Sequence, residues 1–267
     1  MKVNSLLAYL GIPLAGISIV LNVYLYGQLR KYYVELNQVR LDPLGLSYYS
    51  ADSSTNVIEA VKPEGVKRVV FFGDSRAQGW PSPELSGYEF INRGINGQTS
   101  IQTSQRFPHH LADLNPDIVI VQVGINDLKA IPLMPESRNV IIDLCRANIR
   151  QIVEDAKALG ATVIISTILP VGEASLARKP VWSDDIAQAI YEVNGYIDSL
   201  AEEQVLVFDG FSAIANNEGL LPLDYRIDEL HLNTQGYDAL NQAFVEFFES
   251  TEIYEASDTD TVASERY

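Results

Sequence analysis

The chain has 267 residues, of which 47% are hydrophobic, so it can bury a sizeable core. Acidic residues outnumber basic ones by 35 to 19, and the formal charge of −16 repels phosphate backbones, which excludes nucleic acid as an expected partner. The single cysteine, Cys145, excludes an internal disulfide and a cysteine-rich metal site, and we predict that its side chain is buried.

Residues 5–26 form an uncharged, largely apolar segment. As a helix it would extend roughly 33 Å, at about 1.5 Å per residue, which is enough to cross the apolar core of a bilayer. A cleaved signal peptide is the alternative, but its apolar core is usually shorter, and no small-x-small cleavage pattern follows. We therefore predict a single-pass membrane anchor within residues 1–30. Positive charges flank both of its ends and leave its orientation open.

The remaining chain divides into three parts by its composition. Residues 31–66 predict a juxtamembrane helix that leads into a linker, because Pro43, Gly45 and a run of small polar residues interrupt any regular pattern. Residues 67–250 carry the apolar patterns of a folded domain. The acidic end, residues 251–267, has few large apolar side chains and predicts a disordered tail.

Five short runs of apolar and β-branched residues predict the strands of this domain. Their ranges are 68–73, 88–92, 117–124, 161–167 and 205–209. Continuous apolar runs are typical of parallel strands that are covered on both faces. Helical patterns occupy 138–160, 183–203 and 233–250, with Ser183 as an expected N-cap and Gly160 as a stop. This alternation predicts a doubly wound α/β domain with its ligand crevice at the carboxyl ends of the strands.

Polar residues and glycines gather at that expected crevice. They are Ser75 after the first strand, Gly97 after the second, Asn126 after the third, and Asp228 and His231 before the last helix. A serine becomes a nucleophile when an imidazole accepts its proton, and a carboxylate orients that imidazole. The oxyanion then needs N–H donors, for which the amides of Ser75 and Gly97 and the Asn126 side chain are candidates. Each piece alone is typical of a turn or a helix cap, so only their combination indicates catalysis.

Four segments carry these residues and resemble the sequence blocks of the SGNH, or GDSL-like, hydrolases. They are FFGDSRAQGW, INRGINGQTS, VQVGINDL and DELHLNTQGY. The resemblance covers about residues 68–248. It implies a flavodoxin-like three-layer α/β/α fold with a five-stranded parallel sheet and no metal or organic cofactor. It also implies Ser75 as nucleophile, Gly97 and Asn126 as oxyanion donors, and Asp228 and His231 as the rest of the triad.

The function implied by this resemblance is that of a membrane-anchored serine ester hydrolase. It would cleave acyl or acetyl esters of a small molecule, a glycan or a lipid through an acyl-enzyme on Ser75. Two alternatives stay open: a non-catalytic binding or scaffold protein with the same fold, and an O-acyltransferase that acts on a carbohydrate. With the expected anchor, the resemblance also predicts a hydrolase domain outside the cytoplasmic membrane.

The sequence departs from the family after the nucleophile, where leucine is usual and Arg76 stands here. One interpretation is an arginine beside the crevice that recognises a carboxylate or a phosphate in the substrate. The other is a surface arginine that is paired with one of the many acidic residues. His109 and His110 precede the third strand and are interpreted as surface residues away from the crevice.

Overall fold

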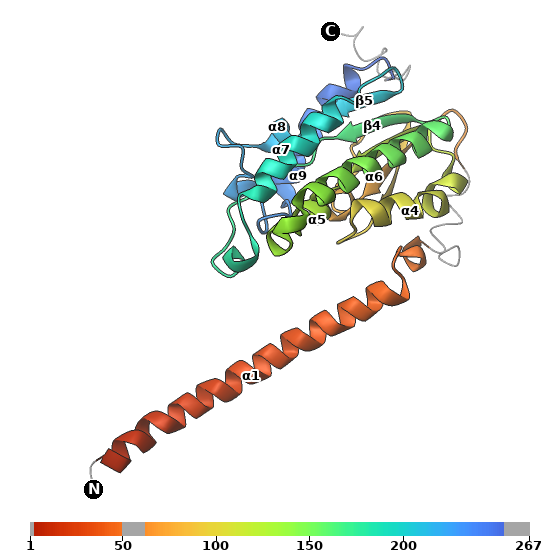
Figure 1. Ribbon diagram of the computed structural model, residues 1–267. Coiled ribbons are helices and arrows are strands. Elements are labelled where there is room, and N and C mark those ends of the chain that lie inside the picture. The colour runs from red at the N-terminus through yellow and green to blue at the C-terminus, as the bar shows by residue number, and fades with distance from the viewer. Residues whose placement is uncertain (1–2, 50–61, 254–267) are drawn as a thin grey trace. The chain divides into compact units, whose positions relative to one another are not determined.

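The computed structural model of the chain describes residues 3–49 and 62–253, with side chains from residue 13 onward (Figure 1). It separates into two units, Met1–Gly45 and Leu46–Tyr267. Most of the expected acidic tail and part of the expected linker lie outside the described residues.

The N-terminal unit consists mainly of one helix, α1 (Val3–Leu41). In the described part of the chain, no helix is both long enough and apolar enough to cross a bilayer. The membrane anchor predicted at 5–26 is therefore not confirmed. Residues 5–12 of this span have no described side chains, and its described part, 13–26, contains the polar residues Ser18 and Asn22.

The domain is built on a five-stranded sheet. Its strands are β1 (Lys67–Gly73), β2 (Tyr88–Gly94), β3 (Ile118–Gln122), β4 (Thr162–Ser166) and β5 (Val205–Phe208). They lie in the order β2-β1-β3-β4-β5, and every pairing is parallel. From β1 the chain first adds β2 on one side and then crosses to add β3, β4 and β5 on the other side. In open α/β sheets, ligands bind at such a change of direction, here between β1 and β3.

Both faces of the sheet are covered, as the continuous apolar runs predict. In β1, Val70 and Phe72 belong to one apolar cluster, whereas Val69 and Phe71 belong to the other. The first cluster is completed by α4 (Ser100–Leu111), α6 (Arg138–Ala158) and α7 (Asp185–Asp198). The second is completed by α8 (Gly210–Ile214) and α9 (Thr234–Glu249). Figure 1 shows these two helical layers on opposite sides of the strands, so the three-layer fold is confirmed.

Short helices occupy many of the connections. They are α3 (Ser75–Gln78), α5 (Ile125–Leu128) and the single turns η1 (Leu46–Tyr49), η2 (Ala112–Leu114), η3 (Ile131–Leu133), η4 (Pro135–Ser137), η5 (Lys179–Val181) and η6 (Leu223–Tyr225). Helix α6 stops just before Gly160, which has a φ of +81°, as expected. Helix α7 begins one residue later than predicted, with Asp184 rather than Ser183 at the N-cap position. Cys145 is fully buried on α6, which confirms its prediction.

Turn η1 belongs to the domain, although its sequence predicts a linker. The Tyr49 hydroxyl donates a hydrogen bond to the Gly94 carbonyl (2.7 Å), and the Arg93 guanidinium lies 4.5 Å from the centre of the tyrosine ring. The same ring meets His110 edge-on, with 5.4 Å between the ring centres. His110 is buried, so its assignment to the surface was wrong, whereas His109 is exposed as expected.

Candidate active site

The turn after β1 places Ser75 at the crevice. A Cβ atom at Gly73 would lie 1.8 Å from the Gln122 carbonyl oxygen, so only glycine lets β1 pass so close to β3. The Asp74 carboxyl then accepts a hydrogen bond from the Arg76 amide (2.9 Å) and caps α3. Ser75 is the first residue of that helix, and its side chain is half-buried at the end of the sheet.

Ser75, His231 and Asp228 form a continuous chain of polar contacts. Ser75 Oγ lies 3.1 Å from His231 Nε2, close enough to donate its proton to that nitrogen when it is unprotonated. On the other side of the ring, His231 Nδ1 lies 2.8 Å from Asp228 Oδ2. The structure thus brings together three residues that are separated by up to 156 positions in the sequence. Both the Asp228 and the His231 side chains are more than a third exposed, so solvent reaches them.

The loop that carries Asp228 and His231 is closed by its own hydrogen bonds. Asp228 Oδ1 accepts from the backbone amides of Leu230 and His231, each at 2.8 Å. The Ile227 amide donates to the His231 carbonyl at the same distance. Burial raises the pKa of the Asp228 carboxyl, but the hydrogen bonds from the His231 side chain and from the two amides outweigh it and lower the pKa below its usual value. The carboxylate is therefore charged when it faces the imidazole.

Gly97 and Asn126 lie on two further loops at the carboxyl ends of β2 and β3. Gly97 has a φ of +75°, a backbone conformation that favours glycine, and it is exposed. Asn126 is buried at the start of α5, and its Nδ2 donates to the Gln98 carbonyl (2.9 Å). Because an amide nitrogen carries two hydrogens, a second donor remains on Asn126. The backbone amides of Ser75 and Gly97 have no acceptor within the described parts of the chain.

A buried arginine that the sequence analysis missed lies beneath these loops. Arg106 of α4 donates through Nη2 to the Gly73 carbonyl (2.8 Å), and its Nε hydrogen bonds to the Gln98 side chain. Its guanidinium also stacks over the Phe72 ring, 4.1 Å from the ring centre. Burial lowers the pKa of Arg106 to about 9. Arg106 therefore ties the turn that precedes Ser75 to the loop that follows Gly97. Helical spacing could have indicated that Arg106 is buried, because the buried Thr103 and His110 lie three and four residues away on the same helix face.

Arg76 matches neither of its two interpretations, because it is fully buried. Its guanidinium donates to three backbone carbonyls: Leu230 through Nε (2.9 Å), Leu169 through Nη1 (2.7 Å) and Pro170 through Nη2 (2.9 Å). Burial lowers the pKa of Arg76 to about 10. An apolar side chain at this position could not donate hydrogen bonds to these carbonyls. Arg76 thus connects the helix of Ser75 to the residue before His231 and to the segment that follows β4.

This arrangement leads to a test of Arg76. Arg76→Leu is expected to lower the free energy of unfolding by about 2–4 kcal/mol, because three buried carbonyls lose their donor. We expect kcat/KM to fall by a similar factor for neutral and anionic esters, since the guanidinium does not face the substrate. Urea unfolding and ester kinetics measure the two effects, with the exposed Arg150→Leu as a matched control. A fall in kcat/KM that is confined to anionic esters would instead show that Arg76 takes part in substrate recognition.

Asp74 is an acid in an unusual environment. It is fully buried, and its Oδ2 has no hydrogen-bond partner among the described residues. Burial raises the pKa of the carboxyl to about 6, although the hydrogen bond from the Arg76 amide and the Arg76 charge oppose this. The unfolded chain would have an ordinary aspartate, with a pKa of 3.8. Between pH 3.8 and about 6, the Asp74 carboxyl is therefore mostly protonated in the folded protein and mostly ionised in the unfolded chain.

The raised pKa of Asp74 predicts that this residue lowers the free energy of unfolding as the pH rises. The folded carboxyl holds its proton more tightly than the unfolded one, so its contribution to stability is most favourable below pH 3.8 and is lost as the pH rises through 6. Between pH 4.5 and 7.5, the wild type should lose about 2 kcal/mol of unfolding free energy relative to Asp74→Asn. Urea unfolding of both proteins at the two pH values measures this difference. A difference that does not change with pH would show that Asp74 titrates normally.

The described residues contain no group of three or more histidine, cysteine, aspartate and glutamate side chains that could hold a metal ion. The arrangement that they do contain is a hydroxyl, an imidazole and a carboxylate in series, with Gly97 and Asn126 on the two segments that follow β2 and β3. Such a set can activate the hydroxyl as a nucleophile toward a carbonyl carbon.

Comparison with known proteins points to the same chemistry. A sequence model of the GDSL-like lipase/acylhydrolase family matches residues 71–239, which is more than half of the chain. An acetylxylan esterase of Geobacillus stearothermophilus is 26% identical over 168 residues, covering 61% of this chain and 73% of that protein. The uncharacterized lipoprotein YqeF of Bacillus subtilis (strain 168) is 27% identical over 148 residues, covering 49% and 60%.

Solved structures share the fold of the domain. The crystal structure of a GDSL-like lipase from Bacteroides thetaiotaomicron VPI-5482 has a TM-score of 0.61 and 26% identity, and covers 77% of this chain and 98% of that one. The acetylxylan esterase Axe2 from Geobacillus stearothermophilus, at 23% identity, has a TM-score of 0.56 and covers 72% and 99%. The chain belongs to the GDSL-like lipase/acylhydrolase family and is an ester-hydrolysing enzyme.

Proposed function

We propose that this enzyme cleaves acyl or acetyl esters through an acyl-enzyme on Ser75. The observation that carries the proposal is the contact of Ser75 Oγ with His231 Nε2, at 3.1 Å, with Asp228 on the far side of the ring. A scaffold protein would have no need to keep these three side chains in series with the donors of Gly97 and Asn126. The series therefore favours catalysis over simple binding.

In the proposed mechanism, His231 takes the proton of Ser75 while Oγ attacks the ester carbonyl. The charged Asp228 holds the Nδ1 proton of the ring and stabilises the imidazolium that forms. His231 then returns the proton to the departing alcohol, which leaves the acyl group on Ser75. Water attacks this acyl-enzyme by the same route and regenerates the serine. A sugar hydroxyl in place of water would give acyl transfer through the same intermediate.

The tetrahedral intermediate carries a negative charge on the former carbonyl oxygen. We assign its stabilisation to the backbone amides of Ser75 and Gly97 and to the second hydrogen of Asn126 Nδ2, because these donors lie on three loops at one end of the sheet. Arg106 supports this arrangement indirectly, since it fixes the Gly73 and Gln98 ends of the two loops. In this proposal, the negative charge that develops on the carbonyl oxygen is stabilised by N–H groups that are already in position before the reaction.

A fluorophosphonate probe tests the proposal directly, because it reacts with an activated serine and stays attached. The full-length wild type is expected to be labelled once, and peptide mapping should place the label on Ser75. Ser75→Ala should not be labelled, whereas Ser86→Ala, an exposed serine outside the site, should be labelled like the wild type. A label on a different serine, or undiminished ester hydrolysis by Ser75→Ala, would refute the assignment.

Attachment of the enzyme to a membrane, with its domain outside the cytoplasm, stays a prediction. Its support is the uncharged sequence at 5–26 and a relative that is named a lipoprotein. Protease added to intact cells should digest the domain if it lies outside. Full protection from digestion, with the protein intact until the cells are lysed, would contradict this location.

A further inference from the structure

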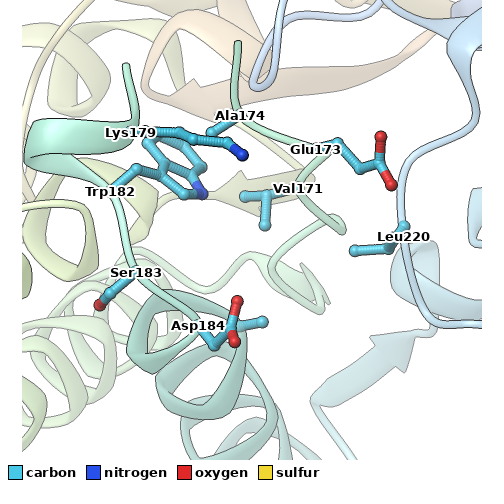
Figure 2. Close-up of a pocket in the computed structure, with 10 residues that line it drawn as sticks. Val171, Glu173, Ala174, Lys179, Trp182, Ser183, Asp184 and Leu220 are labelled. Carbon is cyan, nitrogen blue, oxygen red and sulfur yellow. The ribbon is translucent and has the colours of Figure 1, made fainter. Parts of the chain in front are cut away.

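A hollow of the domain is lined by residues of the segment that follows β4. It has a volume of about 660 Å³ and is formed mainly by the segment that connects β4 to α7, with Ala187 of α7 and Leu220 from the segment after α8 (Figure 2). Its walls include Lys179, Trp182, Glu173, Asp184 and Leu220, with Val171 between them. Figure 2 shows Lys179 and Trp182 on one side of this space and Glu173 and Leu220 on the other. Its volume falls within the range of about 300–1,000 Å³ that is typical of small-molecule sites.

The segment that lines this hollow is hydrogen-bonded to neighbours in sequence of the proposed catalytic residues, Glu229 beside Asp228 and Arg76 beside Ser75. The Gly172 amide, next to Val171, donates to the Glu229 carbonyl (2.9 Å), and Glu229 directly follows Asp228. The buried Glu229 carboxylate also pairs with Arg178 (2.8 Å) on the same connecting segment. The carbonyl of Pro170, just before Val171, accepts a hydrogen bond from Arg76 Nη2 (2.9 Å). A ligand in the hollow would therefore lie next to the loop that carries the catalytic carboxylate and imidazole.

The side chains of the hollow favour one chemical class of ligand. An acyl chain would cover the charged groups of Lys179, Glu173 and Asp184 without replacing their hydrogen bonds to water, which is unfavourable. An anionic ligand would meet two carboxylates and only one ammonium group. A neutral saccharide suits both parts of the lining, because its hydroxyls bind charged groups while its C–H face packs on an indole ring such as Trp182.

We propose that this hollow binds the sugar part of an acylated oligosaccharide, while the ester carbonyl lies at Ser75. This inference rests on the proposed function and specifies its substrate class. Trp182 is placed to pack against a sugar ring, and Glu173, Asp184 and Lys179 are placed to bind its hydroxyls. The interactions are remote from the ester, so they contribute to binding and orientation rather than to the bond-breaking step.

The test compares three esters on the full-length protein: an aryl acetate, an aryl octanoate and an acetylated xylo-oligosaccharide. The variants are Trp182→Ala and the double variant Glu173→Gln with Asp184→Asn. In each, the ratio of kcat/KM for the acetylated oligosaccharide to that for the aryl acetate should fall about tenfold, a change of about 1.4 kcal/mol. The matched control is Asp238→Asn with Glu249→Gln, two exposed acids on α9, which should leave the ratio unchanged.

Binding provides a second readout that needs no turnover. Ser75→Ala should bind the unacetylated xylo-oligosaccharide in a calorimetric titration, and adding Trp182→Ala should weaken this binding about tenfold. Equal loss on all three esters, or loss only on the octanoate, would overturn the saccharide assignment while leaving the esterase intact. Failure of the proposed function differs, because the wild type would then hydrolyse no aryl acetate or Ser75→Ala would retain its activity.

Discussion

Replacing Ser75 or His231 by alanine is expected to lower kcat for an aryl acetate by roughly 10³-fold or more. In the proposed mechanism Ser75 supplies the attacking oxygen, and His231, 3.1 Å away, is the base that removes its proton. Since the two groups act in one step, the double variant should be scarcely worse than either single variant. Steady-state kinetics on purified proteins measures this, and circular dichroism verifies that each variant is folded.

Two matched substitutions control for nonspecific effects. His109→Ala and Ser86→Ala change the same residue types at exposed positions outside the site and should retain full activity. Losses that simply add in the double variant would mean that serine and histidine do not work together. Asp228→Asn should be milder than loss of the serine, because the carboxylate is 40% exposed and water can partly replace it.

Asn126→Ala is expected to reduce kcat by about 10²–10³-fold, or roughly 3–4 kcal/mol, with a smaller effect on KM. The reason is that the amide hydrogen left free by Gln98 would meet the oxyanion only as charge develops on it. Affinity for an aryl boronic acid, which forms a negatively charged tetrahedral adduct with an active serine, should fall in parallel.

A neighbouring asparagine separates this role from structural support. Asn148 hydrogen bonds to the Ser100 hydroxyl (3.0 Å) on α4 and belongs to no part of the proposed oxyanion site. Asn148→Ala should therefore have a much smaller effect on kcat. If Asn126→Ala changed only KM or the unfolding free energy, its amide would hold the Gln98 loop and would not stabilise the transition state.

The layout of the domain was accessible from the sequence because the sheet is covered on both sides. Each strand therefore appears as an unbroken apolar run, and the residues after each run must meet at one end of the sheet. That reasoning placed Ser75 beside His231 across 156 positions, and the distance of 3.1 Å agrees with it. The α4 helix was missed because its apolar residues are few, and buried polar residues such as Thr103 and Arg106 complete its inner face.

What could not be predicted depends on contacts that no local pattern encodes. Arg76 and Arg106 are charged residues of the kind that usually lies at the surface, and they are buried only because backbone carbonyls and the Gln98 side chain satisfy them. Tyr49 is similar, since its segment reads as a linker until its ring meets His110 and Arg93. The hollow lined by Lys179 and Trp182 likewise depends on the path of the connection after β4, which its sequence does not specify.

The three acceptors of Arg76 have a consequence for the evolution of this site. All of them are main-chain carbonyls, at Leu169, Pro170 and Leu230, and every amino acid offers such a carbonyl. Mutations at these three positions can therefore accumulate without breaking the contact, and covariation between homologues would not reveal it. An exchange of Arg76 for leucine, by contrast, would require the backbone of two loops to find new donors at once. We expect this position to show strong epistasis. Leucine at position 76 should be neutral in relatives whose loops fold differently, and damaging when it is introduced into this protein alone.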